Sequence, residues 1–173
     1  MKIKAAPAIL TLSALLLFSG CTDKSDLPVV LKAYPVENLE GLITRTGVEI
    51  DSEITSDGNG SIKIATPEST TVSLYETGDL DIENARLVYQ AKVRTENVIG
   101  QVFLEMWCDF KGKGEYFSRG LNRLVTSTTE WSDTETVFYL REGENPDNIK
   151  LDIVINGVGT VWIDDIKLIK YPL

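Results

Sequence analysis

The stretch Gly159-Thr160-Val161-Trp162-Ile163-Asp164-Asp165-Ile166-Lys167-Leu168 decides the fold, because it is the clearest strand in the sequence. Its β-branched and aromatic residues are typical of a half-buried strand. Two adjacent carboxylates, Asp164 and Asp165, interrupt it, and an unpaired ion among apolar neighbours is costly. We therefore expect a positive or hydrogen-bonding partner beside at least one of them.

Turn signals recur at short intervals in the rest of the chain, for example Asp57-Gly58-Asn59-Gly60 and Gly143-Glu144-Asn145-Pro146. The runs between the turns predict strands at residues 29–34, 61–66, 71–75, 86–95, 101–110, 134–140, 149–155 and 160–169. Residues 38–54 are less regular and predict a loop with a short strand. Residues 115–129 form a long polar segment, either a binding loop or a crossover between sheets. Without a helical period, the pattern predicts an all-β sandwich of antiparallel strands in two sheets.

Alternation in two neighbouring predicted strands separates a core face from a polar face. The core face carries Leu87, Tyr89, Ala91 and Val93 in the first strand and Val102, Leu104, Met106, Cys108 and Phe110 in the second. Its position in this set predicts that Cys108 is an inert buried thiol and not a nucleophile.

The opposite face combines long polar side chains with two large aromatics: Gln90, Lys92, Arg94, Phe103, Glu105, Trp107 and Asp109. If the two strands pair as a hairpin through residues 96–100, these side chains share one surface. A saccharide suits such a surface, since its apolar ring faces stack on aromatics while its hydroxyls hydrogen-bond to amides, arginine and carboxylates. The alternative is that Phe103 and Trp107 pack under residues 115–129 and that the charged groups form cross-strand pairs.

The N-terminal residues predict that the protein is exported from the cytoplasm. Lys2 and Lys4 precede an apolar run that ends in small residues, which is the pattern of a secretory signal over residues 1–20. Leu17-Phe18-Ser19-Gly20-Cys21 resembles a bacterial lipoprotein signal, and this implies cleavage before Cys21 and its acylation, for instance with palmitate. The non-acidic Thr22 after it implies the outer membrane. Residues 21–26 then form a lipidated tether, and residues 27–173 form one domain.

Composition excludes several classes of function. Lys and Arg number 17 against 26 Asp and Glu, for a net charge of −9, and loss of Lys2 and Lys4 with the signal makes the balance more acidic. Nucleic-acid binding needs a basic footprint, so it is not expected. The chain has no histidine, which removes His-based catalytic triads and the commonest zinc ligand.

The closing strand and three earlier segments together resemble the galactose-binding-domain-like jelly roll of many carbohydrate-binding modules. The earlier segments are residues 56–64, residues 87–93, and Thr129-Glu130-Trp131 with Thr136-Val137-Phe138. The resemblance implies a jelly-roll sandwich of about eight to ten strands. It leaves the ligand open, because such domains bind sugars, bind proteins or support a neighbouring domain.

The same resemblance implies a structural calcium ion where the last strand meets the first loop. Asp164 or Asp165 would be its ligand there, and the acidic candidates from the early part of the chain are Glu37, Glu40, Asp51 and Asp57. The alternative is that one aspartate caps backbone amides at a bend of the strand while the other faces water.

Catalysis is not expected. Glu105 and Asp109 lie four residues apart on one strand face, about 13 Å at about 3.3 Å per residue, which exceeds the usual separation of a glycosidase pair. We therefore predict a monomeric, non-catalytic binding module, anchored in the outer membrane through Cys21, that recognises carbohydrate on one sheet face. The alternative is an envelope lipoprotein with a structural or protein-docking role and no sugar ligand.

Overall fold

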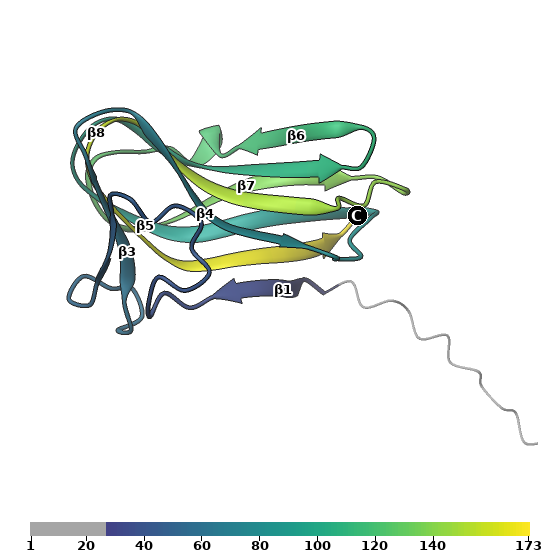
Figure 1. The fold of residues 1–173 in the computed structure, drawn as a ribbon, viewed down its shortest axis with the longest axis horizontal. Helices are drawn as coiled ribbons and strands as arrows, with labels where there is room; N and C mark the ends of the chain where they lie inside the picture. Colours follow the sequence, from purple (N-terminus) through teal and green to yellow (C-terminus); the bar gives the residue numbers. More distant parts are fainter. Residues whose placement is uncertain (1–26) are drawn as a thin grey trace, which may run out of the picture.

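The computed structural model describes residues 27–173, which fold as an all-β jelly-roll sandwich (Figure 1). Its strands are β1 (Val29–Tyr34), β2 (Val48–Asp51), β3 (Ser61–Thr66), β4 (Thr70–Gly78), β5 (Ala85–Phe110), β6 (Gly114–Arg119), β7 (Val125–Leu140) and β8 (Asn148–Pro172), with a 3-10 turn at Leu121–Arg123. Within residues 27–173, no helix is long and apolar enough to cross a membrane. The predicted signal, the lipidation site at Cys21 and the tether lie outside the described residues.

Two long strands, β5 and β8, form the antiparallel ribbon around which the sandwich is built. Their register runs from Ala85 opposite Pro172 to Asp109 opposite Asn148. Midway the ribbon bends, at the left end of the molecule in Figure 1, where the register shifts between Glu96 and Ile99. Glycine permits this bend, because a Cβ on Gly100 would collide with the carbonyl oxygen of Asn156.

The bend divides the ribbon into two layers. The first layer contains residues 85–96 of β5 and 159–172 of β8, extended by β7 on one side and by β1, β3 and β2 on the other. The second layer contains residues 99–110 of β5 and 148–156 of β8, flanked by β6 and β4. All these pairings are antiparallel, as predicted.

The core lies between the layers and is supplied by one continuous face of the ribbon. Leu87, Tyr89, Ala91 and Val93 meet Val102, Leu104, Met106 and Cys108 there, and each of these side chains is at most 1% exposed. Cys108 is buried, as predicted, and burial raises its pKa to about 12, which disfavours the reactive thiolate. Period-two alternation therefore identified the core correctly in both halves of β5.

The two predicted strands on either side of residues 96–100 do not pair as a hairpin. Residues 86–95 and 101–110 belong to one strand, β5, and pair with opposite halves of β8 instead of with each other. Glu96-Asn97 and Asn156-Gly157, which also have the composition of turns, lie within β5 and β8 close to the bend. Residues with positive φ there, among them Asn97 and Gly157, turn the ribbon without ending either strand.

Two further segments differ in how far they match expectation. Residues 38–54 contain a short strand, β2, as predicted. Residues 115–129 are not one polar loop. Residues 115–119 belong to β6, which pairs with the end of β5.

Candidate functional site

The seven predicted binding residues lie in two groups, on the outer faces of different layers. Gln90, Lys92 and Arg94 are in the part of β5 that belongs to the first layer, and Phe103, Glu105, Trp107 and Asp109 are in the part that belongs to the second. The single contiguous surface that the hairpin implied therefore does not form.

The second-layer group gains aromatic and basic neighbours from β6. Trp107 lies directly opposite Phe117, and the two rings are tilted by 45° with their centroids 4.9 Å apart. The guanidinium carbon of Arg119 lies 4.6 Å from the centroid of the Phe117 ring. Phe117 is 49% exposed, so about half of this side chain is open to solvent. We call the set Glu105, Trp107, Phe117 and Arg119 the aromatic platform.

Glu105 holds the platform together from beneath. Its carboxylate is buried, accepts a 2.9 Å hydrogen bond from the indole Nε1 of Trp107 and forms an ion pair with Nε of Arg119. A buried charge that is paired and hydrogen-bonded fixes the orientation of its partners. The indole and the guanidinium are therefore held in place before any ligand arrives.

The neighbouring strand β8 supplies two more charged groups to this face. Lys150 lies opposite Trp107, and its Nζ is 2.8 Å from a carboxylate oxygen of Glu115 on β6. Asp152 lies opposite Glu105 and is only 5% exposed. Burial raises the pKa of Asp152 and the nearby Glu105 charge raises it further, while a hydrogen bond with Ser73 and the charge of Lys150 act in the other direction.

The remaining members of the second-layer group, Phe103 and Asp109, lie outside the aromatic platform. Phe103 is buried at 7% exposure opposite Val154, so its ring is not available to a ligand. This fits the alternative that Phe103 is a packing residue. Asp109 is half-buried opposite Glu115 and Asn148, at the far end of the strand from Phe103.

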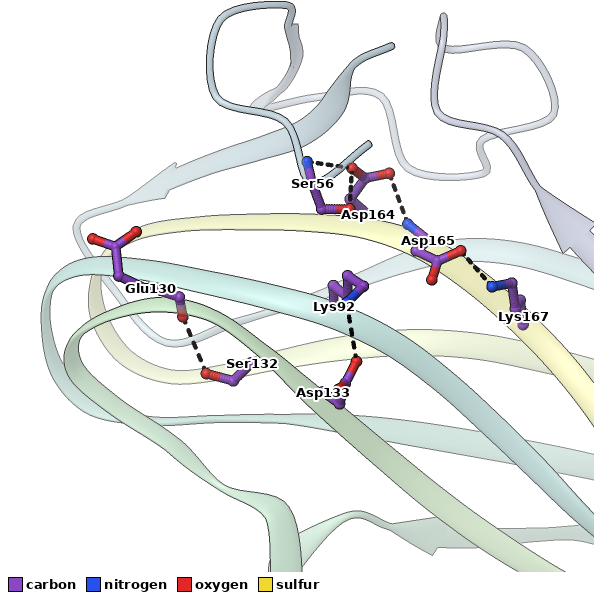
Figure 2. Close-up of polar contacts among 8 residues, drawn as sticks. All are labelled: Ser56, Lys92, Glu130, Ser132, Asp133, Asp164, Asp165 and Lys167. Carbon is purple, nitrogen blue, oxygen red and sulfur yellow. Dashed lines mark hydrogen bonds and ion pairs between the residues drawn. The ribbon is translucent and has the colours of Figure 1, made fainter. Parts of the chain in front are cut away.

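The first-layer group forms cross-strand ion pairs. Lys92 pairs with Asp133 (Figure 2), with 3.4 Å between Nζ and the carboxylate oxygen. Arg94 is 2.7 Å from Glu130. The charged residues of this group therefore follow the alternative of cross-strand pairing. Gln90 lies between Glu135 and Lys167 in the same sheet.

The two aspartates of the closing strand have different partners. Asp164 is 2% exposed and accepts hydrogen bonds from the backbone N–H of Ser56 (2.8 Å), the hydroxyl of Ser56 (2.7 Å) and the backbone N–H of Asp165 (2.7 Å), as seen in Figure 2. Asp165 has a left-handed backbone with φ of 50° and pairs with Lys167 at 2.6 Å. The expected partners are thus protein donors for one aspartate and a lysine for the other.

The other candidate calcium ligands do not converge on this corner. Asp51 accepts hydrogen bonds from the N–H groups of Ile54 and Glu53 and from the indole of Trp162, and those from Ile54 and Trp162 lower the pKa of Asp51 most. Asp57 binds Asn59 within its own turn.

Glu37 and Glu40 are exposed in the loop after β1. Across residues 27–173, no three acidic, histidine or cysteine side chains gather closely enough to hold a metal ion. Calcium takes backbone and amide carbonyl oxygens as well as carboxylates, and the calcium ion stays a prediction from the resemblance.

Comparison with known proteins identifies the fold. No family model and no curated protein matches the sequence. Among solved structures, the chain is similar to the CBM22-1 and GH10 modules of endo-1,4-β-D-xylanase 10B from Clostridium thermocellum, with a TM-score of 0.62 at 13% identity. The similarity covers 82% of this chain and 28% of that one, so this chain spans well under half of the length of the xylanase chain.

A second similar structure matches over nearly its whole length. It is the CBM22-1 xylan-binding domain of Paenibacillus barcinonensis Xyn10C, with a TM-score of 0.60, 15% identity and coverage of 86% of this chain and 99% of that one. A family 16 carbohydrate-binding module is also similar, with a TM-score of 0.51 at 13% identity, covering 70% of this chain and 84% of that one. At these identities, the likeness establishes the β-sandwich fold that carbohydrate-binding modules share.

Several residues of the second-layer face were missed as site residues from sequence. Phe117 and Arg119 fall in the segment predicted to be a binding loop or a crossover between sheets. Lys150 and Asp152 fall in a predicted strand whose neighbours the sequence does not identify. Alternation of Glu115, Phe117 and Arg119 against Tyr116 and Ser118 is the signal that could have found the β6 contribution.

Proposed function

We propose that this chain is a non-catalytic, lipid-anchored module of the cell envelope that binds carbohydrate on the outer face of its second layer. The observation that supports this most directly is the aromatic platform, where the half-exposed Phe117 and the partly exposed Trp107 lie side by side between fixed polar groups. The xylan-binding domain and the xylohexaose-bound xylanase among the similar structures favour the same class of ligand.

The chemistry of the platform suits a saccharide. A pyranose ring can stack its apolar face on Phe117 and Trp107. The guanidinium of Arg119 has N–H groups beyond the Nε that pairs with Glu105, and these can donate to sugar hydroxyls. Lys150 and Glu115 add a donor and an acceptor at the next position along the strands.

The anchoring part of the proposal rests on the N-terminal sequence. Acylation of Cys21 would place the module on the outer membrane as a monomer, facing either the periplasm or the outside. Labelled palmitate incorporated into the wild type and absent from Cys21→Ala would support this, and equal labelling of both would contradict it.

A glycan array first identifies the saccharides that the purified module binds. The affinity of the module is then measured for each of these and for soluble xylan. We expect Phe117→Ala and Trp107→Ala each to weaken binding by about tenfold, since stacking of one ring contributes about 1 kcal/mol or more. Trp131→Ala, which removes a half-buried indole from β7, is the matched control and should bind as the wild type does.

A blank array, or equal binding by all variants, would contradict carbohydrate recognition at the platform. In that case, recovery of one defined envelope protein with the wild type, lost in Phe117→Ala, would favour the protein-docking alternative.

A further inference from the structure

A cavity of about 370 Å³ opens at the end of the sandwich where β6 begins and β7 ends, within the range of about 300–1,000 Å³ typical of small-molecule sites. This is the right-hand end of the molecule in Figure 1, opposite the bend of the ribbon. Its lining combines aromatic and charged side chains: Phe110, Lys113, Tyr116, Phe138, Tyr139 and Arg141, together with Glu144.

Two hydrogen-bonded turns hold the rim of the cavity. Between β5 and β6, the N–H of Lys113 donates to the carbonyl of Phe110 at 2.8 Å. After β7, the N–H of Glu144 donates to the carbonyl of Arg141 at 3.1 Å, and the carboxylate of Glu144 accepts from the N–H of Arg141 at 2.8 Å. Local hydrogen bonds therefore fix the backbones that carry Lys113 and Arg141.

The floor and walls of the cavity are aromatic. Phe110 is nearly buried, and its ring centroid lies 6.2 Å from Phe138 and 5.9 Å from Tyr116, the latter in an edge-to-face arrangement. Tyr116 is 52% exposed and Tyr139 is 62% exposed. The Tyr116 ring thus stands at the surface beside an apolar floor.

The charged side chains around the opening are mostly positive, whereas the chain as a whole is negative. Lys113 and Arg141 form no ion pair with any residue of the described range 27–173. Glu144 is the one acid in the lining, and its carboxylate already serves the turn. In a chain of net charge −9, two available cations beside one engaged carboxylate favour an anion at this position.

We propose that this cavity is a second ligand site and that it takes an anionic sugar residue, a uronate. The carboxylate of the sugar would pair with Lys113 and Arg141, while the ring would lie against Tyr116. A neutral sugar would leave the two cations without a partner, and a small inorganic anion would leave the aromatic walls without one.

This site is separate from the aromatic platform. Tyr116 and Phe117 are neighbours on β6, and successive side chains of a strand point to opposite faces of the sheet. The platform and the cavity can therefore be removed independently.

The test compares digalacturonate with its neutral counterpart galactobiose by calorimetry on the purified chain. We expect digalacturonate to bind at least tenfold more tightly, and Lys113→Ala and Arg141→Ala each to lose about tenfold of that affinity. Lys111→Ala removes the same charge from the same turn without lining the cavity, so it should bind as the wild type does. Phe117→Ala should also leave digalacturonate binding unchanged, which separates this site from the platform.

Three results would overturn the proposal: no binding of digalacturonate at millimolar concentration, equal affinity for both disaccharides, or an equal loss in Lys111→Ala and Lys113→Ala. Melting curves of each variant show whether it is folded. If Arg141→Ala is not, Arg141→Lys keeps the charge and should retain most of the affinity.

Discussion

Glu105 shows how a single residue can organise a surface. Its backbone sits in the centre of the second layer, between Arg119 on β6 and Asp152 on β8. Because its carboxylate binds both the indole of Trp107 and the guanidinium of Arg119, a change at this position disturbs two groups of the aromatic platform together. We therefore regard Glu105 as a positioning residue and not as a direct contact.

Asp152 makes a pH-dependent contribution to stability. Burial raises its pKa in the folded protein above the ordinary value of 3.8, so between these two values the folded state holds a proton that the unfolded chain has released. The contribution of Asp152 is therefore most favourable below about pH 4 and is lost as the pH rises through the raised value. One of its oxygens, Oδ1, has no hydrogen-bond partner, which adds to the cost of the ionised form.

We predict that Asp152→Asn is more stable than the wild type at neutral pH and that this advantage shrinks as the pH falls to about 3.5. Urea unfolding of both proteins at a series of pH values measures the difference. Asp81→Asn, at an exposed position, controls for the loss of one negative charge. A constant difference between Asp152→Asn and the wild type at all pH values would contradict the assignment.

At the scale of the element, the bend of the β5–β8 ribbon depends on glycine. Gly100 has φ of 129°, and a Cβ there would meet the backbone carbonyl of Asn156 on the facing strand. Gly112, in the β5–β6 turn, also has a positive φ, of 76°, but has no atom within 4 Å of where its Cβ would be. A side chain at Gly112 therefore adds only the cost of a positive φ, whereas a side chain at Gly100 also collides with the facing backbone.

We predict that Gly100→Ala lowers the free energy of unfolding by at least about 3 kcal/mol, whereas Gly112→Ala lowers it by about 1 kcal/mol. Denaturant titrations of the two variants beside the wild type measure both values. Equal effects would show that the bend tolerates a side chain and that the facing backbones can move apart.

Sequence periodicity predicts strands well and their connections poorly. The bounds of β1 and β3 agree with the predicted ranges, because each is a short β-rich run between clear turn signals. The continuity of β5 could not be predicted, since Glu96-Asn97 and Gly100 are equally compatible with a hairpin and with a bend. The same ambiguity placed Lys92 and Trp107 on one face, whereas they belong to opposite layers.

At the scale of the whole molecule, the candidate site depends on which strands become neighbours. Trp107 and Glu105 were found from the sequence because they combine aromatic and acidic groups on one strand face. Their partners Phe117 and Lys150 come from β6 and β8, and only the folded topology places those strands on either side of β5. Alternation assigns a face within one strand but not the neighbours of that strand.

The predicted calcium ion is tested on the stability of the whole domain. If an ion binds beside Asp164 and Asp165, adding calcium to protein treated with a chelator should raise its melting temperature, and the double variant Asp164→Ala, Asp165→Ala should show no rise. An unchanged melting curve of the wild type would contradict the calcium site. In the chelator, the variant should melt lower in either case, because the N–H and hydroxyl of Ser56 lose their buried acceptor.

The paired arms of β5 and β8 also set how the chain reaches its native state. Among the paired residues of the ribbon, Asp109 and Asn148 are the closest in sequence, and Ala85 and Pro172 are the farthest apart in sequence. Both layers therefore wait for two segments distant in the sequence to meet, and this loop closure costs entropy before any burial repays it. Folding should accordingly be slow, on the order of milliseconds to seconds. A nascent chain can complete the second layer only after residue 156 has been made, and the first layer only after residue 172.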